Sequence, residues 1–449
     1  MNGLDPIRHS RTDGEPGHWH GVGPPAPGRE PRIARPSGWL SFDQGNLSQE
    51  QVLKNLEQVV SMLQTASVGL NEIDDLLTDS IAVLSAHWSA REGQAAPPEE
   101  LREYTAQRLA AMEEIARGCR FHGRGLLDGQ CGVAGAGRGV VFIRGGPNTA
   151  TSPPEGYAVR ITDFPSRAAI TGGVPVNEDW IWAEQEVFLA EGDRFVRFRA
   201  ARGNSVTDFL RELQEAVRAS GLDLEIALTQ QRRLVVRHTQ YGSQFKFKGS
   251  SLNTPLLSKR PGKLEWSRKG TDIQGSLGGE PAFGIGRMLV GFLDNEHTSE
   301  LAIAWKGEAP KEGQGFACQL VQNGIAFQDS ETPEAARLRI SLPSLLPKQL
   351  GRWVDTRSGV ASLAALNTDS WQEVLDGLYV LLAVSGEVVE WKDRVRAWIE
   401  RYQNRALISL RQGFAAAPEP PTEPAYAGRA ESMATLLRDR IQGGPGTAE

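Results

Sequence analysis

The chain has 449 residues, with 49 Lys and Arg against 55 Asp and Glu, so its formal net charge is −6. This small negative charge argues against a protein held electrostatically on nucleic acid or on an anionic membrane. With 40% hydrophobic residues, three cysteines and no C-x-x-C pair, the sequence predicts a soluble protein of roughly two to four domains, without a membrane-spanning helix, a disulfide scaffold or a zinc module.

The first segment, residues 1–45, is rich in Gly, Pro, Arg and His and has few aliphatic side chains. Such a segment buries too little apolar surface to offset the loss of chain entropy, so we expect a disordered tail. The segment also has no apolar core of the kind found in a secretory signal peptide, so no cleaved signal is expected.

The next segment, residues 46–135, predicts a long helix followed by a shorter one. Leucines recur every seven residues from Leu56 to Leu84, which is the spacing of a helix face that packs against a partner helix. Ser48 and Gln51 are placed to cap the start of this helix. Apolar residues on one side of residues 98–118 predict the second helix, which completes an αα-hairpin.

Between the helices the chain changes to Gly-rich, strand-like alternation, which predicts two β-rich domains over residues 136–260 and 261–362. A helix that begins after Ser205 interrupts the first of them and predicts a compact βαββ unit. The short alternating runs that predict strands are residues 156–164, 184–191, 193–200, 223–230, 233–240, 245–250, 271–279, 288–293, 300–305, 315–323 and 336–342.

A third long helix is predicted over residues 368–411, inside a C-terminal segment of residues 363–412. It also has one narrow stripe of apolar residues spaced seven apart, so we expect it to pack along the first helix; two independent helices in separate domains are the alternative. Residues 413–449 combine a Pro-rich linker with a short amphipathic helix. The predicted seam residues are Leu56, Leu63, Leu70, Leu77, Leu84, Val374, Leu381, Val388, Val395 and Tyr402.

In chain order these elements predict an α+β fold. A long antiparallel helical rod, made of the N-terminal αα-hairpin and the C-terminal helix, carries inserted β-rich domains, and both tails are disordered.

No residue pattern predicts an enzyme, a cofactor or a metal site. The glycines of GAGRG (135–139) come before the predicted strand, so they do not form a dinucleotide-binding turn. The adjacent carboxylates Asp74 and Asp75 point about 100° apart on a helix and cannot act as a facing dyad. Cys119 follows a helix C-terminus, where the dipole disfavours a thiolate, so we expect a buried structural cysteine.

Residues 232–248 alternate basic and apolar side chains on strands that we expect to pair, which gives one cationic sheet face. We interpret this face as the solvated outer side of a sheet, with a glycan- or nucleic-acid-binding face as the alternative.

Several runs resemble the bacterial flagellin family. QTASVGLNEIDDLL (64–77) and CRFHGRGLLDG (119–129) resemble the end of the flagellin N-terminal helical region. Residues 203–238, GNSVTDFLRELQEAVRASGLDLEIALTQQRRLVVRH, resemble the flagellin hook IN module of flagellins and filament-cap proteins. Residues 269–291 and 318–329 resemble the later β-domain of flagellins. Residues 367–410 resemble the flagellin C-terminal helix.

The resemblance implies a self-assembling structural subunit of the bacterial flagellar filament, with a role in motility. It implies an extracellular location, reached through the flagellar type III export apparatus without a cleaved signal peptide. The implied partners are other flagellin-like subunits, the export apparatus and an export chaperone, with no nucleic acid and no membrane insertion.

The ends of the chain depart from the flagellin pattern. Prolines occur in residues 1–45 and in PEPPTEP (418–424), where flagellins carry their terminal helices, and each proline disrupts a helical turn. We therefore expect these helices to be missing, and we keep a second hypothesis: a non-polymerising flagellin paralogue that acts as a binding protein, either an adhesin or a regulator of export.

Overall fold

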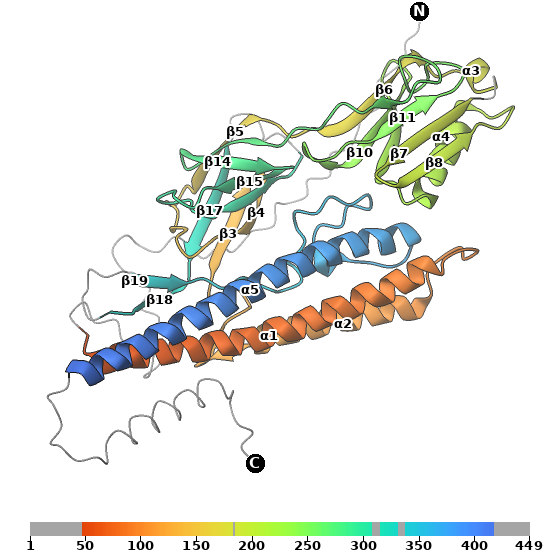
Figure 1. The fold of residues 1–449 in the computed structure, drawn as a ribbon. Coiled ribbons are helices and arrows are strands. Elements are labelled where there is room, and N and C mark those ends of the chain that lie inside the picture. The colour runs from red at the N-terminus through yellow and green to blue at the C-terminus, as the bar shows by residue number, and fades with distance from the viewer. Residues whose placement is uncertain (1–46, 183–184, 308–314, 331–336, 417–449) are drawn as a thin grey trace, which may run out of the picture. The chain divides into compact units, whose positions relative to one another are not determined.

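The computed structural model describes residues 47–182, 185–307, 315–330 and 337–416 (Figure 1). These residues form the predicted α+β fold, in which long helices near the two ends of the described chain pack together and β-sheets are inserted between them. The tail predicted for residues 1–45 and the short helix predicted within residues 413–449 lie outside the described residues. None of the described helices combines the length and the apolar character needed to cross a bilayer.

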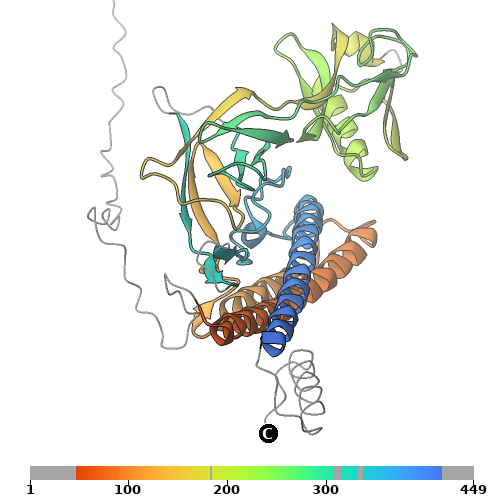
Figure 2. The same cartoon turned by 60° about the vertical axis from the view of Figure 1, so that its left-hand side comes forward.

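Three long helices make up the helical part. They are α1 (Gln49–Ser89), α2 (Glu99–Gly118) and α5 (Trp371–Ala416), and α1 contacts both of the others. The start of α1 has the predicted capping box, because the Gln51 N–H donates to the Ser48 hydroxyl and the Ser48 N–H donates to the Gln51 side chain. Figures 1 and 2 both place α1 alongside α2 and α5.

One antiparallel sheet has eight strands in the order β3-β17-β5-β13-β14-β15-β16-β4. The hairpin strands β3 and β4 occupy opposite ends of this order yet contact each other, so the sheet curves around an apolar core. The strands are β3 (Val133–Arg138), β4 (Val140–Arg144), β5 (Tyr157–Asp163), β13 (Gln274–Leu277), β14 (Glu280–Ile285), β15 (Met288–Gly291), β16 (Ala302–Trp305) and β17 (Phe316–Gln322).

This sheet corrects the expected division of the β-rich segment at residues 260 and 261. Strand β5 pairs with β13 and β17, so strands from both sides of that boundary share one sheet. Two-residue alternation reports which face of a strand is buried but not which distant strand completes its hydrogen bonds. The remaining domain boundaries stay predictions.

Strand β4 follows the glycine run of residues 135–139, as predicted, but Gly135 and Gly137 also lie inside a strand of their own, β3. A Cβ atom added at Gly135 would lie 2.6 Å from the Phe142 ring. The glycine therefore permits a close approach between β3 and β4.

A second β-region contains two sheets around one apolar core, to which helix α4 (Val206–Ala219) contributes Phe209, Leu213 and Val217. The sheets have the orders β6-β10-β9 and β12-β11-β7-β8. The helix lies between two hairpins in sequence, but the hairpins belong to different sheets. The elements are β6 (Arg167–Pro175), α3 (Glu178–Trp182), β7 (Glu186–Glu191), β8 (Arg194–Arg199), β9 (Leu224–Leu228), β10 (Arg233–Tyr241), β11 (Lys248–Ser251) and β12 (Glu265–Trp266).

The expected cationic face over residues 232–248 is not one face of one sheet. Strand β10 pairs with β6 and β9, whereas β11 pairs with β7 and β12, so the basic residues of β10 and β11 lie on different sheets. Five short elements complete the described chain: the pair β1 (Arg120–Phe121) and β2 (Arg124–Gly125), the pair β18 (Ile325–Gln328) and β19 (Arg337–Ile340), and the 3-10 helix η1 (Leu363–Ala365).

Candidate functional site: the paired terminal helices

Helices α1 and α5 pack antiparallel along their lengths. Their contacts, followed from one end to the other, join Gln49 with Ser409, Asp74 with Lys392, and Gln94 just beyond α1 with Trp371. The Lys392 ammonium lies 2.6 Å from the Asp74 carboxylate, and the Trp371 indole N–H donates to the Gln94 carbonyl at 3.1 Å. The first residues of α1 therefore meet the last turns of α5, and the order reverses at the other end.

The ten predicted seam residues are all buried, with exposed fractions between 0% and 3%. Each large apolar side chain removed from water in this way contributes about 1.5–3 kcal/mol. The seven-residue spacing of buried positions is that of a helix face packed on a partner, and the side-chain pairing of these residues across α1 and α5 stays a prediction.

Strand β18 lies against both helices. The Asn55 side chain of α1 donates to the Gln328 carbonyl at 3.1 Å, and the Phe327 ring meets the Tyr402 ring of α5 edge to face at a centroid distance of 5.2 Å. The chain between α2 and α5 thus contacts both α1 and α5 through strand β18.

An ion pair follows this strand, between Asp329 and Arg405 of α5. The Asp329 side chain is 0% exposed, and one guanidinium nitrogen of Arg405 lies 2.7 Å from its carboxylate. Burial raises the pKa of the Asp329 carboxyl, and the positive charges of Arg405 and Arg401 oppose part of that rise. Sequence reasoning missed this pair, because a single aspartate after a strand has no distinguishing pattern.

Apolar side chains also remain on the outside of the helices. Val68 of α1 is 57% exposed, and Leu382, Val389 and Ile408 of α5 are 54%, 44% and 54% exposed. Leu382 and Val389 are seven residues apart, so they share a face of α5 that the described residues leave open. These side chains are available for contacts with another chain.

The thiol of Cys119 is half-buried rather than fully buried, and it donates to the Thr65 carbonyl at a sulfur–oxygen distance of 3.5 Å. Burial, followed by the negative charges of Glu72 and Asp128, raises its pKa to about 11. The thiol is therefore protonated at neutral pH, which is the state of a structural cysteine rather than of a nucleophile.

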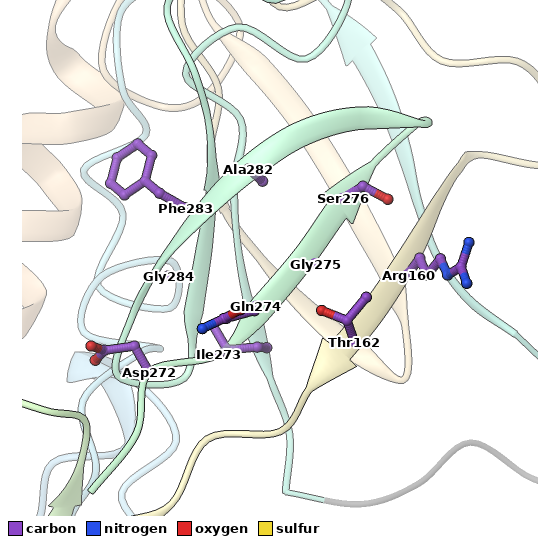
Figure 3. Close-up of a pocket in the computed structure, with 10 residues that line it drawn as sticks. All are labelled: Arg160, Thr162, Asp272, Ile273, Gln274, Gly275, Ser276, Ala282, Phe283 and Gly284. Carbon is purple, nitrogen blue, oxygen red and sulfur yellow. The ribbon is translucent and has the colours of Figure 1, made fainter. Parts of the chain in front are cut away.

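A hollow of about 550 Å³ lies over β5, β13 and β14 (Figure 3). Its charged lining residues are Arg160 and Asp272. Burial raises the pKa of Asp272, but hydrogen bonds from Ser243 and from the Gly286 N–H outweigh it and hold that pKa below its usual range. The Asp272 carboxylate thus accepts hydrogen bonds from the backbone N–H groups of Ser243 and Gly286. The ten residues that line the hollow do not place a nucleophile beside a base.

Within the described parts of the chain, no three His, Cys, Asp or Glu side chains gather where they could hold a metal ion.

No protein-family model matches the chain, and no curated protein does. Among solved structures, the D1-D2-D3 domains of the flagellar cap protein FliD from Escherichia coli are 10% identical, with 51% of this chain and 66% of that chain covered and a TM-score of 0.30. FliC from Burkholderia pseudomallei is 12% identical, with 77% and 99% covered and a TM-score of 0.27. Flagellar hook associated protein-3 from Legionella pneumophila is 12% identical, with 87% and 98% covered and a TM-score of 0.22. The similarity to these proteins is distant.

Proposed function

We propose that this chain is a flagellin-like structural subunit of the bacterial flagellar filament, which contributes to motility by self-assembly outside the cell. The packing of α1 against α5 carries the proposal, because it joins two distant parts of the sequence into one long helical surface and leaves the sheets as insertions. A filament requires extended surfaces that bind head to tail, rather than a reactive pocket. The flagellin-like runs in both helical regions support the same function.

The open apolar face of α5 supports assembly with other flagellin-like subunits. Leu382 and Val389 are large apolar side chains that solvent reaches, and a neighbouring subunit would bury them. The remaining proposed partners are the flagellar type III export apparatus and an export chaperone, which would hold the subunit before assembly.

Replacing both Leu382 and Val389 with aspartate is expected to prevent assembly without unfolding the chain. Both positions are exposed in the subunit, so two charges there cost little until a neighbouring subunit has to bury them. Salt-induced polymerisation, followed by sedimentation and negative-stain microscopy, measures the effect. The matched control is Ala397→Asp, which adds a charge at another exposed position of α5 and should assemble normally.

The alternative function is a non-polymerising paralogue that acts as a binding protein. The prolines of residues 1–45 and 418–424 favour it, because they interrupt segments that form continuous helices in flagellins. A folded wild-type chain that stays monomeric with and without added filament seeds would contradict the filament subunit and support this alternative.

Export is expected to depend on the flagellar apparatus and to leave the N-terminus uncut, because residues 1–45 contain no apolar signal segment. Culture medium from strains with and without a functional export gate can be blotted for the protein, with a cytoplasmic marker as the control for lysis. Mass spectrometry of the secreted chain reports its N-terminus. Equal amounts of protein outside both strains would contradict this route.

A further inference from the structure

The sheet β12-β11-β7-β8 has one face in the core and one face outside it. Val187 and Leu189 of β7 are fully buried in the core, so Phe188 and Ala190 between them point to the other face. Residues opposite each other in register share a face. One row across the outer face is therefore Phe195, Ala190, Lys248 and Trp266.

Aromatic and apolar side chains gather on this outer face. Trp266 is 57% exposed and Phe195 is 62% exposed, and the Phe195 ring stacks on the Phe188 ring at a centroid distance of 5.9 Å. Leu264, two residues before Trp266, is 45% exposed, and Leu252, just after β11, is 52% exposed. A monomeric protein rarely leaves so many large apolar side chains together in solvent without a partner.

Two lysine ammonium groups lie over the Trp266 ring. The ammonium nitrogens of Lys248 and Lys246 lie 4.5 Å and 4.9 Å from its centroid. Among the described residues, neither lysine forms an ion pair with a carboxylate. Residues 246–269 contain seven Lys and Arg against one Glu, a local charge of +6 in a chain whose net charge is −6.

We propose that this aromatic–lysine face (Phe188, Phe195, Lys246, Lys248 and Trp266) binds an acidic polysaccharide. A uronic acid unit has an apolar face of C–H groups, which can stack on an indole ring, and a carboxylate at the edge of its ring. The ammonium groups of Lys246 and Lys248 lie over the Trp266 ring, within reach of the carboxylate of a sugar unit bound at this tryptophan. The Phe188–Phe195 pair on the same face gives a second apolar surface, which suits an extended chain of such units.

Two other polyanions fit the face less well. Nucleic acids are bound mainly through phosphates, for which arginine forks are the better donors, whereas the cations beside Trp266 are lysines. An anionic bilayer takes up apolar side chains that reach below the lipid headgroups, whereas the Phe188 and Phe195 rings stack on each other on the sheet. The face lies on an inserted domain and not on the long helices, so this inference is independent of the proposed assembly.

Binding of the full-length chain to polygalacturonate, a carboxylated polysaccharide, tests the proposal by affinity electrophoresis and by titration calorimetry. Wild-type protein should bind polygalacturonate, lose affinity as salt is added, and ignore neutral dextran. Trp266→Ala and the double change Lys246→Gln with Lys248→Gln should each weaken binding by roughly tenfold or more.

The matched controls are Trp180→Ala, which removes another exposed tryptophan, and the double change Lys306→Gln with Lys348→Gln, which removes two exposed charges elsewhere. Both should bind as the wild type does. Absence of polygalacturonate binding, or equal binding by all variants, would overturn the proposal. So would tighter binding to poly(dT) or to phosphatidylglycerol vesicles than to polygalacturonate. None of these results bears on filament assembly, which is measured separately.

Discussion

Leu70→Asp is expected to destabilise the helical bundle by about 3–5 kcal/mol, because it places an unpaired charge at a position that is 0% exposed. The aspartate loses the apolar contacts of the leucine and has no cation in the seam to pair with. Because α1 packs on both α2 and α5, the loss should spread through all three helices. Circular dichroism at 222 nm, recorded during urea and thermal unfolding, measures the change.

Val68→Asp is the control for this variant. It adds the same charge two residues away on the same helix, at a position that is 57% exposed. Its unfolding free energy should stay within about 0.5 kcal/mol of the wild type. If Leu70→Asp unfolds at the same urea concentration as Val68→Asp, the seam does not hold the bundle together.

Arg405→Met is expected to destabilise the chain by about 2–3 kcal/mol at neutral pH, because it leaves the fully buried Asp329 carboxylate without its cation. This destabilisation is smaller than that expected for a fully buried ion pair, because the Arg405 side chain is 42% exposed and solvent screens part of its charge. Arg396→Met, which removes a 67% exposed arginine paired with Asp393 on the surface, is the matched control and should change stability little.

The destabilisation caused by Arg405→Met should become smaller as the pH falls. Burial raises the pKa of Asp329 in the folded chain, and removal of Arg405 raises it further. The folded state therefore binds the proton more tightly than the unfolded chain, and the destabilisation of Arg405→Met should shrink as pH falls from 7 toward about 4. Adding Asp329→Asn to Arg405→Met should remove most of that pH dependence. A penalty that grows on acidification would contradict the assignment of Asp329.

The three long helices could be predicted to within a few residues at each end, because their signals are local. A repeat of seven marks the buried side of α1 and α5, and the pair Ser48 and Gln51 fixes where α1 begins. Residues 368–411 were expected as the third helix, and the structure has Trp371–Ala416. The nearly equal lengths and single apolar stripes of two helices also led to the prediction that they pack together.

The pairing of strands and the side-chain contacts with the helical pair could be identified only in the tertiary structure. Alternation indicates which face of a strand is buried, but it is the same whichever strand lies beside it, so the joining of β5 to β13 and β17 had no signal in the sequence. The same holds for Asp329 and Arg405, and for the lysines that flank Trp266. The sequence by itself thus determined the helices and their buried stripe through short-range periodicity, whereas hydrogen bonds and charge pairs between distant residues were decided only when the chain folded.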